Sequence, residues 1–132
     1  MLKIARSFLA VVAAYAVMVI LITLAQEGLF GGVSLQESAP AELFGAGLLT
    51  FLSAVAGGFL VAFLAGRAYR AHGLIMSALV VVETTTLVLT HRLPGPLWFD
   101  LLASASLIVG IVAGAELFRW FRERPEATTT TS

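Results

Sequence analysis

The stretch that decides the fold covers residues 54–90, AVAGGFLVAFLAGRAYRAHGLIMSALVVVETTTLVLT. It consists of two apolar segments joined by a short basic link between Arg67 and His72. The first segment carries a row of small residues, and the second carries one carboxylate, Glu83, near its middle. The stretch predicts a pair of long apolar helices, around which the rest of the chain is arranged.

The composition indicates an integral membrane protein. Apolar residues make up 59% of the 132 residues and charged residues only 12%, which is unlike a soluble domain. About 20 apolar residues in a helix cross roughly 30 Å of hydrocarbon. We therefore predict an all-α membrane protein, a bundle of four transmembrane helices in one domain over residues 1–121. The predicted spans are about 6–26, 42–66, 73–90 and 97–118, followed by a disordered cytoplasmic tail over 122–132.

The first apolar run has a rival interpretation as a cleaved signal peptide, because it follows Lys3 and Arg6. The run is longer than the usual apolar region of about 7–15 residues in such peptides. No small-x-small cleavage site follows it at 24–27. We therefore predict a retained span.

The placement of the basic residues predicts the orientation. With four spans, both termini and the link between the second and third spans share one side. Of the eight Lys and Arg residues, only Arg92 falls on the other side. An excess of Lys and Arg marks the cytoplasmic side, so both termini are expected in the cytoplasm of a multi-pass protein of the plasma or inner membrane. The basic residues on the side of the termini are Lys3, Arg6, Arg67, Arg70, Arg119, Arg122 and Arg124.

Residues 27–42 are predicted to form an acidic outward-facing loop. They contain three glycines and three carboxylates but no basic residue. Near their end, Ser38, Pro40 and Glu42 resemble a helix start, with a hydroxyl cap, a proline in the first turn and an acid at the positive end of the dipole.

Two spans carry small residues at a spacing of four, which lets another helix backbone approach closely in lipid. The sequence leaves two possibilities open: both rows could face neighbouring helices of the same chain, or one could lie outside and bind a second copy or a partner subunit. The rows are Ala54, Gly58, Ala62 and Gly66 in the second span, and Ser106, Gly110 and Gly114 in the fourth.

Glu83 is the polar residue to which we would assign chemistry, because an ionised carboxylate within the bilayer costs several kcal/mol or more. It could form a proton- or cation-coupled site, or it could be a neutral, hydrogen-bonded group that fixes helix register or meets a partner. At its depth the candidate partners are Tyr15, Ser53 and Ser106, with Ser104 as an alternative to Ser106, and Thr86 lies one turn away on the same helix face.

The other polar residues indicate no enzyme active site. His72 and His91 are expected among lipid headgroups at opposite ends of the third span, about 28 Å apart, so no shared metal or haem site is predicted. The chain has no Cys, which excludes disulfides and thiolate chemistry. We expect no cofactor, no metal, no nucleic-acid partner and no catalytic residue. Glu116 is expected to pair with Arg119 or Arg67, and the expected headgroup ligands are Arg67, Arg70, Arg119 and Arg122.

Several short motifs resemble those of small bacterial membrane proteins with four spans. They are Gly57-Gly58-Phe59 followed by Ala62, Ala65-Gly66-Arg67, His72, and Pro96-Leu97-Trp98-Phe99. The resemblance covers roughly residues 50–120, implies a fold and no activity, and does not include Glu83. Small multidrug exporters have the same span count, but their working carboxylate lies in the first helix, where this chain has none.

The sequence thus predicts a non-catalytic accessory or scaffolding membrane subunit that assembles through its small-residue rows. Its expected partners are the lipid bilayer and either a second copy or a partner membrane subunit. The alternative is a small oligomeric transporter or channel, coupled to protons or cations through Glu83.

Overall fold

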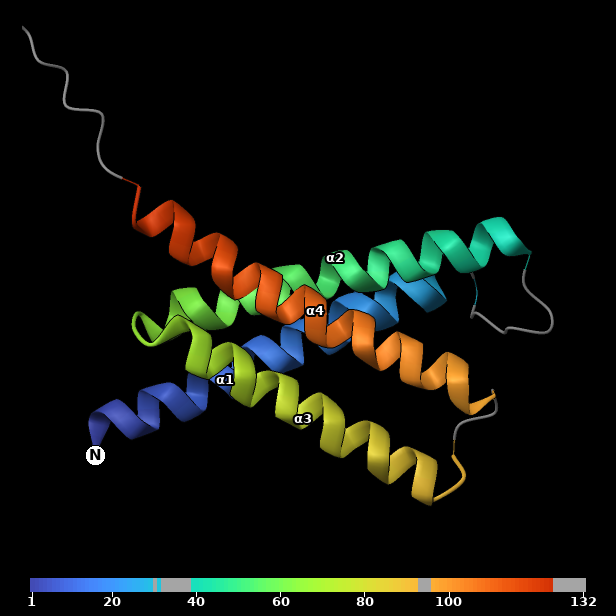
Figure 1. The fold of residues 1–132 in the computed structure, drawn as a ribbon, viewed down its shortest axis with the longest axis horizontal. Helices are drawn as coiled ribbons and strands as arrows, with labels where there is room; N and C mark the ends of the chain where they lie inside the picture. Colours follow the sequence, from blue (N-terminus) through green and yellow to red (C-terminus); the bar gives the residue numbers. More distant parts are fainter. Residues whose placement is uncertain (30, 32–38, 93–95, 125–132) are drawn as a thin grey trace, which may run out of the picture.

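In the computed structural model the chain is a bundle of long helices (Figure 1). The structure describes residues 1–29, 31, 39–92 and 96–124, and that part of the chain contains helices and no strands. All four α-helices are long and apolar enough to cross a membrane. The elements are α1 (Leu2–Thr23), the π-helix η1 (Leu24–Leu29), α2 (Pro40–Ala65), α3 (Tyr69–Leu89) and α4 (Leu97–Arg122).

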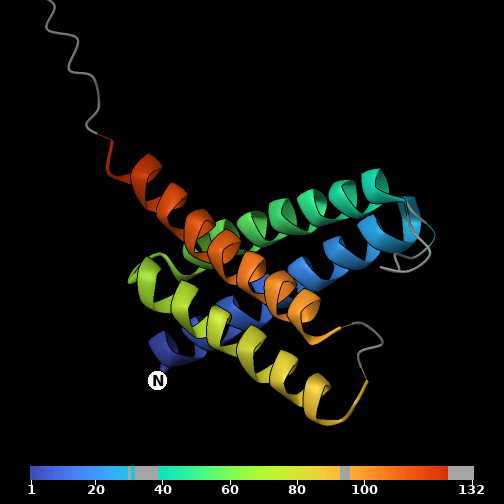
Figure 2. The same ribbon diagram turned by 45° about the vertical axis from the view of Figure 1, so that its right-hand side comes forward.

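Helices α2 and α4 form the central pair. They make the most extensive contact in the bundle, α1 packs mainly on α2, and α3 packs mainly on α4. In Figure 1, α4 crosses in front of α2 while α1 lies behind it, and the turned view of Figure 2 shows the same order. Helices α1 and α3 touch each other only lightly, so the two outer helices leave one side of the bundle loosely closed.

The two rows of small residues meet at the α2–α4 crossing. A Cβ atom added to Gly58 of α2 would lie 2.0 Å from the carbonyl oxygen of Ile111, and one added to Gly114 of α4 would lie 2.0 Å from that of Val55. Side chains at these two positions would collide with the backbone of the facing helix. The rows of α2 and α4 therefore pack against each other within one chain.

Five further side chains fill the core where the outer helices join this pair. The fully buried side chains of greatest volume come from all four α-helices: Met18, Val61, Met76, Val80 and Ile111. A Cβ atom on Gly57 would lie 2.9 Å from Cε of Met76 and 3.0 Å from Cβ of Met18. The missing side chain of Gly57 thus gives α1 and α3 room to reach α2.

The link between α2 and α3 is shorter than predicted. Gly66 ends α2 in the left-handed conformation with φ 69°, and α3 already begins at Tyr69, four residues before the predicted start at 73. Gly66 and Ala68 both adopt the left-handed conformation, so the chain turns within the three residues between α2 and α3. No proline or glycine follows until Gly73. Gly66 is therefore a helix-terminating residue, and assigning it to the packing row of α2 was wrong.

The helices also extend beyond other predicted boundaries, and α1 already begins at Leu2, four residues before the predicted start at 6. α1 continues into η1 as far as Leu29, so the predicted loop at 27–42 begins later, and α4 includes Arg122, which was assigned to the tail. At the start of α2, Pro40 is the first helical residue and the Glu42 carboxylate accepts the Ala39 N–H at 3.2 Å. The cap predicted at Ser38 and the part of the predicted disordered tail beyond residue 124 lie outside the described residues.

Large apolar side chains cover the outer faces of all four α-helices, including Phe8, Phe44, Leu74 and Leu102. A continuous apolar surface of this kind is unfavourable in water and marks a surface that contacts lipid or another protein. The fold is therefore compatible with a multi-pass membrane protein.

Candidate functional site

Glu83 lies on the loosely closed side of the bundle, between α3 and α1. The Tyr15 hydroxyl of α1 donates a hydrogen bond to Oε2 of Glu83, and Glu83 is exposed. Glu83 is fourteen residues from the start of α3, which is about 21 Å of helix, and about 9 Å from its end at Leu89. Because α3 begins earlier than expected, the midpoint of the helix lies before Glu83, which is therefore past the middle of α3 and not near it as predicted.

The other predicted partners of Glu83 do not form hydrogen bonds with it. Ser53 is buried and its hydroxyl donates to the Leu49 carbonyl oxygen at 2.8 Å, while that of Thr86 donates to the Val82 carbonyl oxygen at 2.8 Å. A short hydroxyl side chain on a helix commonly bonds back to the preceding turn, and the hydroxyl groups of Ser53 and Thr86 both do so. Tyr15 reaches Glu83 because its phenol is long enough to span the gap between α1 and α3.

Thr84, the next residue along α3, contacts α4, the helix on the other side of α3 from α1. Its hydroxyl is 2.7 Å from the Ser104 hydroxyl of α4. Successive helix residues point about 100° apart, so Glu83 faces α1 while Thr84 faces α4. Polar contacts on two faces of α3 thus fix its rotation relative to both neighbouring helices.

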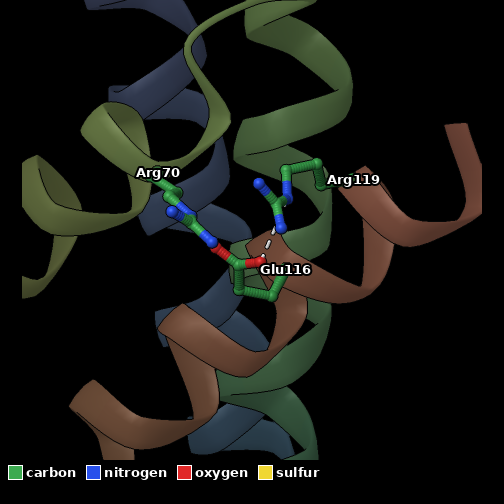
Figure 3. Close-up of polar contacts among 3 residues, drawn as sticks. All are labelled: Arg70, Glu116 and Arg119. Carbon is green, nitrogen blue, oxygen red and sulfur yellow. Dashed lines mark hydrogen bonds and ion pairs between the residues drawn. The ribbon is translucent and has the colours of Figure 1, made fainter. Parts of the chain in front are cut away.

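An ion cluster joins the first turn of α3 to the last turns of α4 (Figure 3). The Glu116 carboxylate accepts from Nε of Arg70 through Oε1, and Nε of Arg119 lies 3.1 Å from its Oε2. Glu116 was expected to pair with Arg119 or Arg67. The second partner is Arg70 instead, because α3 begins at Tyr69 and its first turn presents Arg70 to α4, while Arg67 stays exposed in the link.

His72 is buried, so its predicted position among lipid headgroups was wrong. Only 5% of its surface is exposed, and Nδ1 lies 2.9 Å from the Ala68 carbonyl oxygen. Its Nε2 has no hydrogen-bond partner among the described residues. The early start of α3 places His72 in the first helical turn, four residues before the buried Met76, so the imidazole faces the bundle interior.

Two cavities bring together residues that the sequence analysis did not assign to a common site. One, of about 420 Å³, lies between η1, α2 and α4; it is mostly apolar and also contains Ser106 and the hydrogen-bonded pair Gln26 and Thr50, 3.2 Å apart. The other, of about 950 Å³, lies between α1 and α2 and is lined by Arg6 and Arg122. Sequence spacing gave no signal for either, because each combines residues from distant helices.

Within the described ranges, no three His, Asp or Glu side chains are grouped closely enough to hold a metal ion. No family model, curated protein or solved structure matches the chain.

Proposed function

We propose that this chain is a multi-pass protein of the plasma or inner membrane, with both termini in the cytoplasm, and that it serves as a non-catalytic accessory or scaffolding subunit. Four membrane-length apolar helices support the membrane placement. Seven of the eight Lys and Arg residues lie near the termini, in the link between α2 and α3 or in the first turn of α3, which supports the orientation. The outward apolar faces then contact lipid.

The observation that carries the subunit proposal is the exposed carboxyl group of Glu83, held by Tyr15 on the loosely closed side. A carboxyl group facing hydrocarbon is costly, and polar side chains in membranes favour helix association because the partner supplies hydrogen bonds. The small-residue rows of α2 and α4 already contact each other, so they leave no close-packing surface for a partner. The proposed assembly surface is therefore the α1–α3 side around Glu83 and Tyr15.

Substitutions at Glu83 test this surface by oligomeric state. In mild detergent, Glu83→Leu is expected to shift the parent assembly toward monomer, because leucine offers a partner no hydrogen bond. Glu83→Gln, which mimics the protonated acid, should keep the assembly. Glu123→Gln, which removes an exposed acid at the end of α4, is the matched control. Light scattering coupled to size-exclusion chromatography gives the mass; a monomeric parent, or a Glu83→Leu variant that assembles like the parent, argues against the proposal.

A second candidate is a small proton- or cation-coupled transporter or channel. It is favoured by the phenol partner of Glu83, because the hydrogen bond from Tyr15 gives this carboxyl group a polar neighbour on a second helix. The same variants distinguish the two functions when oligomeric state and thermal unfolding are followed from pH 5 to 9. A pH-dependent transition in the parent that Glu83→Gln lacks supports coupling through Glu83, whereas identical profiles support the subunit role.

A further inference from the structure

The cavity of about 950 Å³ is an open groove with a basic end and an apolar floor. It lies between the first half of α1 and the last turns of α2. Leu9, Ala13 and Phe63 contribute apolar lining, while Arg6 and Arg122 line it with guanidinium groups. We propose that this groove binds one anionic phospholipid, with its phosphate between the two arginines and an acyl chain along α1.

Arg6 is positioned for phosphate by its contact with the end of α2. Its Nε donates to the Leu64 carbonyl oxygen at 3.1 Å, one of the last carbonyls of α2, which have no partner within the helix. Its Nη2 lies beside Gly66, where a Cβ atom would be only 3.0 Å away. The Nη N–H groups remain for a ligand, and the planar guanidinium fork matches two phosphate oxygens.

The charge around the groove selects an anion. Glu116 engages Arg70 and Arg119 on the α3 side, whereas no carboxylate is among the residues that line the groove. Within the described ranges, neither Arg6 nor Arg122 forms an ion pair. The two guanidinium groups therefore favour a lipid with a net negative headgroup over a zwitterionic lipid, whose own cation they would repel.

The depth of the groove suits a lipid and not a free ion. Arg6, Gly66 and Arg122 belong to the end of the bundle where α1 begins and where α2 and α4 end. From Arg6 to Ala13 the groove follows α1 for about 10 Å toward the bundle centre. A headgroup at the basic end thus places its acyl chain against apolar side chains, whereas inorganic phosphate would leave most of the groove empty.

The experiment measures binding of phosphatidylglycerol to the detergent-purified chain by native mass spectrometry, with phosphatidylcholine and inorganic phosphate as the other probes. Removing a charge-assisted hydrogen bond should weaken binding about tenfold or more, so Arg6→Gln and Arg122→Gln are expected to lose phosphatidylglycerol to that extent. Lys3→Gln removes the same charge from the same helix outside the groove and should bind like the parent. Ala13→Phe fills the apolar end without changing charge and should also lose the lipid.

Several results would overturn the inference. These are equal binding of both lipids, equal binding by the parent and Ala13→Phe, or a response to inorganic phosphate as large as that to phosphatidylglycerol. Ala13→Phe leaves the Arg6 contact to α2 intact, so it remains informative if Arg6→Gln unfolds. The inference depends on the proposed membrane placement but not on assembly at Glu83. Glu83→Leu should therefore retain the lipid whatever its oligomeric state.

Discussion

Replacing Gly58 with alanine is expected to destabilise the bundle by about 3 kcal/mol, at the upper end of the usual cost of overpacking. The added methyl group would lie 2.0 Å from the carbonyl oxygen of Ile111. Backbone atoms cannot rotate away as a side chain can, so α2 and α4 must separate along their crossing. The loss of close packing between these helices removes the main source of association available in lipid.

Thermal unfolding in detergent measures this effect, and two other glycines of α2 provide graded controls. A Cβ atom on Gly57 would lie 2.9 Å from the flexible end of Met76 and 3.0 Å from Cβ of Met18, and neither contact is with backbone, so Gly57→Ala should cost less than Gly58→Ala. A Cβ atom on Gly47 meets nothing within 4 Å, so Gly47→Ala should leave the unfolding temperature unchanged or raise it, since alanine favours helix over glycine. Equal unfolding temperatures for all three variants would contradict the α2–α4 packing.

Truncation of Met76 is expected to cost about 2 kcal/mol, because a buried Met→Ala change leaves a cavity. Met76 is fully buried on α3 and belongs to the core cluster with Met18 and Ile111. Its loss removes packing between α3 and the central pair. Few other large side chains of α3 contribute to this packing. The measurement is again the shift in the unfolding transition in detergent.

The adjacent residue supplies the control for Met76. Ile75 is 52% exposed, so Ile75→Ala removes a similar volume from the outer surface and should cost little. Met76→Leu keeps the volume and should cost less than about 1.5 kcal/mol. A larger effect at Ile75 than at Met76 would mean that α3 faces the bundle with its other side.

The helices were predictable from the sequence because their signals are local. Long apolar runs fix which segments become membrane-length helices, and proline and glycine separate them. The boundary of α3 was missed because the residues from Tyr69 to His72 look like a polar link, although nothing in them breaks a helix. Because α3 begins at Tyr69, His72 lies in its first turn and is buried, and Glu83 lies past the midpoint of the helix.

The candidate sites were predictable only in part, because they depend on how the helices rotate against one another. Counting residues placed Tyr15 at the depth of Glu83, but depth alone did not separate it from Ser53 or Ser106. The small-residue rows were visible as spacing in the sequence, yet their partner is set by tertiary packing. From the sequence, Arg6 indicates only the orientation of the chain in the membrane. No local pattern predicts that its side chain bonds to the Leu64 carbonyl oxygen at the end of α2.

The small-residue rows of α2 and α4 pack against each other within one chain. Disulfide trapping tests it cleanly, because the chain has no cysteine of its own. An added Cβ at Gly110 would lie 2.7 Å from Cβ of Ala54, so a small separation gives the spacing of about 3.8 Å that a disulfide needs.

The measurement compares Ala54→Cys and Gly110→Cys in one chain with the same two substitutions on separate, differently tagged chains expressed together. We expect oxidation of the double variant to give a linked species of monomer mass without free thiols, and the separate chains to form no mixed dimer. Mixed dimers from the separate chains, with an unlinked double variant, would instead place the rows between subunits and rule out packing within one chain.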